Sequence, residues 1–545
     1  MKGRRLGLGI WGLGFGISDL GFGISGLLPV PNRSPLAPLA GMPNRSPLAP
    51  LAGRGAGGEG SWNRLLGSES SPLPASQPRV PNPKSQIRNL LLCTVPALGL
   101  WALLASPSWA RAGEPERLAL RVGKVVTMDA ENRVLNNATV LLSDGKIEKV
   151  GPADSVPIPD GYKLIEKPDH WLLPGIVEAH NHAAGSMRDL HDYVYLTNPG
   201  LRTLEALVPE GDDAKRARAG GVTTVLMIPG SGNNLSGLGT LTKLGGDSVD
   251  EMLIRSPGCL KVSQAGNPEG YWYGVGRAFM YYNLRQTLQK ALAYHRAWEQ
   301  YEKRKSEKEV GDLGFRIWDL GILGASTLSP QPSTLNSQPS TLHPQPSTLN
   351  PQPEFDLFWD DFRPVFQRKM IALVHTQWYQ VVMSTVDMMA KKLNIRTVLG
   401  HSCFEAYQTA PLVVEQGDVY VCEGPRQLHF DRRQRKIMGN AARWWQGGVR
   451  KLSVNTDSPV IPQEELPFQA AMACHYGWKP YEALRGITRI TAETLMLEDR
   501  VGSIEPGKDA DLGLWTGDPI DPRSACELTV INGRIVYDAQ VRREF

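Results

Sequence analysis

Short apolar runs rich in β-branched residues alternate with longer amphipathic stretches through the middle of this chain. Runs of this kind that end at a polar or turn residue predict buried β-strands. They read IVEAH, VTTVLMIPG, CLKVSQ, IALVH, RTVLGH, VYVCEG and KLSVNTD. Helical periodicity is found at 214–219, 285–308, 381–393 and 481–495. Strands that alternate with helices favour a parallel sheet, and seven or eight such units predict a TIM-like (β/α)8 barrel of the α/β class over residues 174–508.

The two ends of this core have a different pattern. Residues 113–173 and 509–545 alternate short strand-like runs with turns and carry little helical periodicity. Because the two stretches match in kind, we expect them to form one composite β-sandwich domain from both ends of the core.

Residues 1–83 form a low-complexity leader. GFGIS and PNRSPLAPLAG each occur twice there, and such Gly- and Pro-rich repeats cannot build a packed core. Residues 84–112 follow as a signal peptide, with two basic residues, an apolar run and a final Ala-Arg-Ala. The run is short for a membrane span and contains Pro96, so we expect cleavage rather than a stable membrane anchor, and export to a secretory, periplasm-like or organelle compartment. The leader is either the first part of a bipartite targeting sequence or an error of the gene model.

A second low-complexity segment, 311–353, interrupts the barrel region. Its proline-containing seven-residue units, such as STLHPQP, exclude a helix or a central strand. The segment is interpreted either as a disordered surface loop or as sequence foreign to the fold.

Composition narrows the function. The 545 residues carry a net charge of +4, and the basic excess lies in the leader, so nothing suggests a nucleic-acid partner. The six cysteines lack CxxC spacing, which argues against a zinc finger and a disulfide framework. We expect a small-molecule substrate, and a homo-oligomer is compatible with the sequence.

Four histidines and one aspartate lie at or just after the ends of the strand candidates: His180, His182, His375, His401 and Asp457. The C-terminal ends of parallel barrel strands converge on one face, and residues i and i+2 of a strand point the same way. Imidazole suits a divalent metal, so we expect the histidines to bind one or two ions, with zinc favoured. Asp457 is the expected general base for a metal-activated water.

Three further features are weaker. Lys261 lies among apolar residues of a strand candidate, where a carbamate formed from carbon dioxide could bridge two metals; an ammonium that reaches solvent is the alternative. The glycine-rich stretch 229–246 is interpreted as a mobile loop beside the site. The remaining histidines of the core lack strand-end placement and are interpreted as surface or helix residues: His170, His191, His295, His429 and His475.

These motifs give the chain a resemblance to the amidohydrolase superfamily, in its imidazolonepropionase-like branch. The similarity covers roughly 117–305 and 365–540, and it rests on LLPGIVEAHNHAAG, ARAGGVTTVLMIPGSGNN, NTDSPVIP and DRVGSIEPGKDADLGLWTGDP. It implies a metal-bearing TIM-like barrel with a composite β-sandwich that hydrolyses carbon–nitrogen bonds other than peptide bonds.

The resemblance also implies roles for individual residues. His180 and His182 match the first-strand ligands, His375 and His401 the ligands of strands five and six, and Asp457 the acid of strand eight. Lys261 resembles the fourth-strand lysine that some branches carboxylate.

The chain departs from the pattern of the family it resembles at Gln377, Trp378 and Ser458, where members often carry histidine or arginine. These changes put the substrate in doubt rather than the metal site. A cyclic amide, an amidine or an N-acyl compound is the leading expectation. The alternatives are a prolidase-like metal-dependent dipeptidase and a non-catalytic binding protein on the same scaffold.

Overall fold

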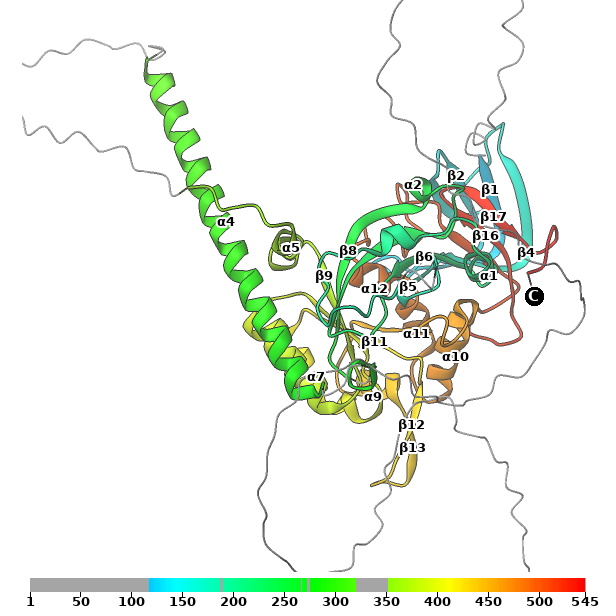
Figure 1. The fold of residues 1–545 in the computed structure, drawn as a ribbon. Helices are drawn as coiled ribbons and strands as arrows, with labels where there is room; N and C mark the ends of the chain where they lie inside the picture. The colour runs from blue at the N-terminus through cyan, green and yellow to red at the C-terminus, as the bar shows by residue number, and fades with distance from the viewer. Residues whose placement is uncertain (1–116, 187–189, 266, 272–274, 320–350, 545) are drawn as a thin grey trace, which may run out of the picture. The chain divides into compact units, whose positions relative to one another are not determined.

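The computed structural model describes residues 117–186, 190–265, 267–271, 275–319 and 351–544. The expected leader and signal peptide lie outside the described residues, as does most of the expected insert. The described residues belong to one compact unit, built from two large sheets and the helices that cover them (Figure 1).

The larger sheet has eight strands in the order β14-β11-β10-β9-β8-β7-β6-β5. Their bounds are β5 Ile176–Asn181, β6 Val222–Met227, β7 Leu235–Lys243, β8 Leu253–Ser263, β9 Ile371–Thr376, β10 Thr397–His401, β11 Val419–Glu423 and β14 Leu452–Val454. Each of the seven sequence-predicted strands is present. Neighbouring strands pair in parallel except on the two sides of β7, which is antiparallel to both β6 and β8.

Strand β7 corrects the interpretation of the glycine-rich stretch as a mobile loop. Residues 235–243 are buried along their whole length. Glycine is needed because the strand passes close to other backbone: Gly237 has φ +122°, and a Cβ there would lie 2.5 Å from the carbonyl oxygen of Leu201. Glycine has a low propensity for strands, so a propensity argument does not reveal that packing requires it here. The expected all-parallel (β/α)8 order is therefore wrong at this strand, whereas the mixed α/β class is right.

Where the sheet curls round on itself, the edge strand β5 meets the segment that follows the other edge strand, β14. Asn181 forms a parallel bridge with Ser458, and the His182 amide donates to the Ser458 carbonyl at 2.9 Å. The result is a nearly closed, barrel-like sheet whose seam lies beside His182.

Helices and short 3-10 or π turns follow most of the strands. They are η1 Thr203–Ala206, α1 Asp212–Ala219, α2 Val249–Met252, α3 Asn267–Tyr271, α4 Arg277–Asp319, α5 Leu357–Asp360, α6 Arg363–Phe366, α7 Tyr379–Thr385, η2 Val386–Lys392, η3 Phe404–Thr409, α8 Ala410–Gln416, α9 Asn440–Gln446, η4 Gln463–Glu465, α10 Leu466–His475, α11 Pro480–Gly486 and α12 Arg489–Thr494. A hairpin of β12 (Leu428–Asp431) and β13 (Lys436–Gly439) precedes α9. The predicted helix at 481–495 is thus two helices, separated at Ile487–Thr488.

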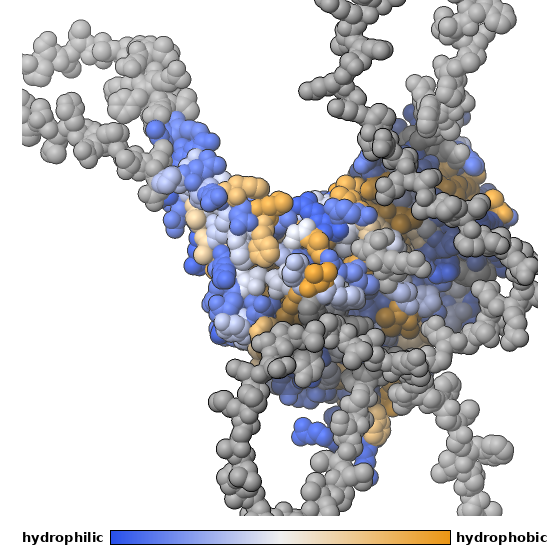
Figure 2. Space-filling view, in the orientation of Figure 1, coloured by the Kyte–Doolittle hydropathy of each residue, from blue (hydrophilic) through white to orange (hydrophobic). Residues whose placement is uncertain are grey.

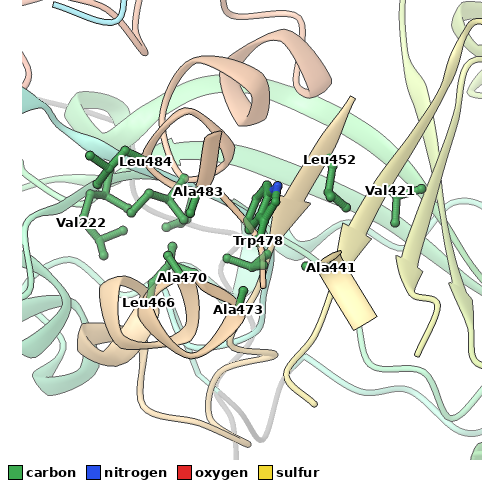
Figure 3. Packing of buried hydrophobic residues seen from close by; sticks show 14 of the residues in the cluster. Val222, Val421, Ala441, Leu452, Leu466, Ala470, Ala473, Trp478, Ala483 and Leu484 are labelled. Atoms are coloured by element: carbon green, nitrogen blue, oxygen red, sulfur yellow. The ribbon is translucent and has the colours of Figure 1, made fainter. Parts of the chain in front are cut away.

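The helices near β14 pack onto the outside of the sheet. Figure 3 shows Trp478 among small and branched side chains of α10, α11 and β14, including Ala473, Ala483 and Leu452. Burying apolar surface of this kind contributes about 25 cal/mol per Å² removed from water. This packing covers the outer side of β14 with the two helices that follow it.

Helix α4 runs on to Asp319, so residues 311–319 are helical and the expected irregular insert begins too early. The reason is that the helix-breaking prolines start further along the chain, at Pro330. The first half of α4 packs on the sheet through Leu284, Leu288 and Ala291. Figure 2 shows hydrophilic residues over the part that extends away from the strands.

The second sheet draws its strands from both ends of the core, in the order β17-β16-β15-β4-β1-β2-β3. The bounds are β1 Leu118–Val126, β2 Val134–Ser143, β3 Lys146–Pro152, β4 Lys163–Pro174, β15 Leu512–Trp515, β16 Cys526–Ile531 and β17 Arg534–Asp538. The pairing of β15 with β4 joins the two ends. A composite sheet is therefore present, and its arrangement as a sandwich stays a prediction.

Within the described residues, no helix combines the length and the apolar character needed to cross a membrane.

Candidate metal centre

The residues singled out from the sequence meet at one end of the barrel. His180 and His182 lie at the end of β5, and Lys261 lies in β8. His375 and His401 close β9 and β10, and Asp457 follows β14. The predicted convergence of strand ends is therefore seen, because the parallel strands direct their C-terminal ends to the same rim.

The carboxylate of Asp457 is at the middle of the group. Its Oδ1 lies 3.0 Å from His180 Nε2 and 3.2 Å from His182 Nε2, and its Oδ2 lies 3.9 Å from His401 Nε2. One potential ligand atom from each of His180, His182 and Asp457 falls within 4.8 Å of the others.

Backbone carbonyls orient two of the imidazoles. His182 Nδ1 lies 2.8 Å from the carbonyl oxygen of Ile228, and His401 Nδ1 lies 2.7 Å from that of Gly424. A ring whose Nδ1 carries the proton in such a bond presents Nε2 as a lone-pair donor. Both rings therefore direct the nitrogen that a metal would need toward Asp457.

His375 and Lys261 complete the group on its inner side. The ring of His401 lies 4.3 Å from that of His375 and 4.4 Å from that of His180, measured between centroids. Lys261 Nζ is 3.4 Å from His180 Nε2 and is fully buried, which contradicts the alternative of an ammonium that reaches solvent. Gln377 Nε2 approaches His375 Nε2 at 3.4 Å, so this departure from the family pattern contacts the site itself.

Burial sets the charge of the group. Desolvation lowers the pKa of His180 and His375 well below the usual value, and it lowers the pKa of His401 as well, with Lys261 acting in the same direction on all three. Burial alone would raise the pKa of Asp457, but His401 and His180 hold it well below its usual range. Burial lowers the pKa of Lys261 to about 8. Neutral imidazoles around a carboxylate are the forms that ligate metals.

The backbone is strained where two of these residues lie. His401 has φ 67° and Asp457 has φ 51°, in the left-handed region that non-glycine residues rarely adopt. Strain of this kind concentrates at functional sites, where the surrounding structure enforces it. A Cβ at position 400 would lie only 3.0 Å from His180 Nδ1, so Gly400 leaves room for this ring.

Two residues beside the group escaped the sequence interpretation. Glu178 is fully buried in β5, and burial raises its pKa to about 7 against hydrogen bonds from Thr456 and Gln463. The available signal was an acid two residues before His180. His191, expected to be an ordinary surface or helix residue, lies in a loop with its ring 6.0 Å from that of His182, and burial lowers its pKa to about 4. No periodic pattern marks a loop residue, so the sequence offered no signal for it.

The donor set fits a divalent metal. Several buried ring nitrogens have no hydrogen-bond partner among the described residues, namely His180 Nδ1, His375 Nδ1 and His401 Nε2. Buried polar atoms are normally paired, and His401 Nε2 faces the Asp457 carboxylate at 3.9 Å without a hydrogen bond, as the ligand atom of a cation would.

The segments that continue β9, β10 and β11 line a cavity of about 850 Å³. Tyr379, Phe404 and Arg426 contribute to its wall, together with His429, which is buried in β12 rather than on the surface. Its wall includes residues that follow His375 and His401 along the chain, and its size suits a small molecule.

Comparison with known proteins identifies relatives of this architecture. The model of the amidohydrolase family matches residues 388–540. The solved structure of an amidohydrolase from Thermotoga maritima MSB8 is similar with a TM-score of 0.61 and 26% sequence identity, over 77% of this chain and 100% of that one.

Two curated proteins are similar over parts of their length. Amidohydrolase tasK of Hapsidospora irregularis is 23% identical over 437 residues, which span 74% of this chain and 40% of that protein. A 5-methylthioadenosine/S-adenosylhomocysteine deaminase of Symbiobacterium thermophilum is 38% identical over 69 residues, which span 13% of this chain and 16% of that protein. The matches thus cover less than half of each curated relative.

Proposed function

We propose that the chain is a metal-dependent hydrolase of carbon–nitrogen bonds other than peptide bonds and a member of the amidohydrolase superfamily, which its family match and its relatives support. A cyclic amide, an amidine or an N-acyl compound is the proposed substrate class. The observation that carries the proposal is the approach of His180, His182 and Asp457 to within 4.8 Å of one another at the C-terminal rim of a barrel-like sheet. The amidohydrolase and deaminase relatives support the reaction type.

His180, His182 and His401 would hold the metal through their Nε2 atoms. His375 and Lys261 are the further ligands that we propose. A divalent cation there supplies Lewis-acid polarisation of the substrate and lowers the pKa of water. Asp457 is held ionised, so its carboxylate can accept a proton from the attacking water as the new C–O bond forms. It then returns this proton to the leaving nitrogen as the C–N bond breaks.

The test is metal content and turnover of the purified protein, measured on a panel of cyclic amides, amidines and N-acyl compounds. We expect one or two zinc ions per chain and turnover that His182→Ala abolishes together with most of the metal. His475→Ala is the matched control, because His475 is exposed at the end of α10 and is not one of the residues that meet at the site. A His182→Ala protein with full metal and activity would contradict the proposal.

A second candidate, a prolidase-like dipeptidase, is favoured by one observation. Lys261 is fully buried, with its Nζ 3.4 Å from His180 Nε2. Its pKa is lowered to about 8, which increases the fraction of the neutral amine that can react with carbon dioxide. Carbon-13 NMR of protein supplied with labelled bicarbonate would reveal a carbamate. An unmodified lysine together with no cleavage of Xaa-Pro dipeptides would exclude this candidate.

The third alternative is a binding protein without catalysis. It predicts a folded, metal-loaded protein that hydrolyses no member of the panel, and the same assay therefore decides it.

A further inference from the structure

The seam of the barrel has a buried acid at its centre. Glu178 lies in β5, two residues before His180, and is completely shielded from solvent. Its Oε1 accepts hydrogen bonds from the backbone amide of Thr456 at 2.6 Å and from the Thr456 hydroxyl at 2.7 Å. Its Oε2 accepts from Gln463 Nε2 at 2.9 Å. One side chain of the first barrel strand thus contacts the segment after the last strand at three points.

That segment carries Asp457. The Ser458 amide donates to the Thr456 hydroxyl oxygen at 3.1 Å, and the Val460 amide donates to the Asp457 carbonyl at 2.9 Å. The Ile461 amide donates to the Thr456 carbonyl at 3.2 Å. The turn on both sides of Asp457 is therefore closed by hydrogen bonds, and Thr456 connects this turn to Glu178.

The strained backbone of Asp457 requires such support. A φ of 51° costs free energy for a non-glycine residue and persists only when the surroundings enforce it. Regular ladder pairing does not provide this support, because β14 ends at Val454, before Asp457, and the contact with β5 is the bridge between Asn181 and Ser458.

We propose that Glu178 is a positioning residue that holds Asp457 at the distance from His180 and His182 that catalysis needs. This inference rests on the proposed function, in which Asp457 moves the proton. His180 and Glu178 belong to the same strand, so the acid ties the proton-accepting carboxylate to the strand that carries the first two ligands. A displacement of about 1 Å at such a group costs on the order of 100-fold in rate.

The experiment compares four variants in the metal-loaded, full-length protein. Glu178→Ala removes all three hydrogen bonds, whereas Glu178→Gln keeps an acceptor for Thr456 and is the conservative variant. Thr456→Val removes only the hydroxyl. Thr494→Val is the control, because Thr494 is equally buried and its hydroxyl donates to a backbone carbonyl at 2.7 Å in α12, away from Asp457.

We expect Glu178→Ala to lower kcat about 100-fold and Thr456→Val about 10-fold, with KM and metal content nearly unchanged. Glu178→Gln should stay within about 5-fold of the wild type, and Thr494→Val should keep full kcat even if it lowers stability. Amide hydrogen exchange of the peptide spanning 455–461 should become faster in Glu178→Ala and Thr456→Val and stay unchanged in Thr494→Val.

Folded Glu178→Ala with kcat within about 3-fold of the wild type, or equal loss of kcat in Thr494→Val and Thr456→Val, would overturn the proposal. If Glu178→Ala fails to fold, the comparison of the two threonine variants decides. If the wild type hydrolyses no carbon–nitrogen substrate, the proposed function fails, while hydrogen exchange still decides whether Glu178 fixes the Asp457 turn.

Discussion

Two buried clusters of charged and titratable groups lie in this molecule, and they differ in how completely their polar atoms and charges are paired. In the first, at the C-terminal rim of the barrel, Asp457 contacts three imidazoles and several ring nitrogens have no hydrogen-bond partner among the described residues. In the second, Lys243 of β7 donates to Asp509 at 3.0 Å, to Asp511 at 2.5 Å and to Asn532 at 3.2 Å.

The second cluster joins the barrel to the C-terminal strands of the other sheet. The Asp509 carboxylate also contacts Lys146 Nζ at 2.6 Å and Arg500 Nη2 at 2.7 Å, so three cations pair with it. A buried charge is tolerated when it is paired and hydrogen-bonded, and this cluster meets that condition within the protein itself. The first cluster meets it only with an added cation. We therefore interpret the fully paired cluster as one that stabilises the fold and the incompletely paired cluster as the one that would bind a cation.

The largest effect is expected from Asp457→Asn in the first cluster. The change keeps the shape of the side chain and removes its ability to accept a proton, so kcat should fall about 100- to 10,000-fold. Unfolding of the metal-free protein by urea should change little, since without its metal the incompletely paired cluster stabilises the fold weakly. Steady-state kinetics at matched metal content check the first part. Retained kcat would mean that another group moves the proton.

In the second cluster, Lys243→Met should act on stability alone. Removing the cation leaves two buried carboxylates without their common partner, and we expect a loss of about 3–5 kcal/mol in the free energy of unfolding. The kcat per folded molecule should be unchanged. Urea denaturation measures the loss, and Lys303→Met is the control, because Lys303 is 76% exposed on α4 and should cost less than about 0.5 kcal/mol. A stable Lys243→Met protein would show that the cluster is not a stabilising one.

Removing the metal with a chelator should lower the stability of the protein through the first cluster, which otherwise affects activity. At a free metal concentration of about 100 times Kd, binding stabilises the native state by about 3 kcal/mol, and a chelator removes that contribution. The thermal midpoint should fall and should recover when zinc is added back. Asp457→Asn protein should respond less than Lys243→Met protein, and an equal response of both would contradict the assignment of the metal to the first cluster.

The smallest effect is expected from pH acting on Asp509. Burial alone would raise its pKa, but Lys243, Lys146 and Arg500 lower it to about 2. An acid with a depressed pKa stabilises the native state above its unfolded pKa and loses this contribution as the pH falls through the folded value. We therefore expect about 2 kcal/mol of stability to disappear between about pH 4 and pH 2. The difference in unfolding free energy between the wild type and Asp509→Asn should shrink over the same interval, and a constant difference would contradict the pairing.

Most barrel strands could be predicted because each is a short apolar run that ends at a polar residue. Strand β7 could not, since its glycines lower strand propensity, and only the close backbone of Leu201 shows why they are required. The helix α4 extends past Gly311 because the composition change that suggested a boundary precedes the prolines that end a helix. The break at Thr488 between α11 and α12 likewise has no local signal in the pattern.

The candidate site was largely predictable for a related reason. His180, His182, His375, His401 and Asp457 each follow an apolar strand, and parallel strands must bring such residues to one rim. His191 was missed because it lies in a loop, whose path depends on tertiary contacts. Glu178 was visible as an acid near His180, but its partners, Thr456 and Gln463, are far away in the sequence.

The sequence by itself determined the α/β class, the strand ends that carry the metal-binding residue types, and the contribution of both chain ends to one sheet. Periodicity and residue chemistry are local properties, so they can be read along the chain. Only the tertiary structure decided that β7 runs antiparallel, that Lys243 is neutralised by Asp509 and Asp511, and that Glu178 holds the turn of Asp457. Each of these depends on a contact between segments that are far apart in the sequence. Such a contact contributes free energy only after the barrel has closed and brought the segments together.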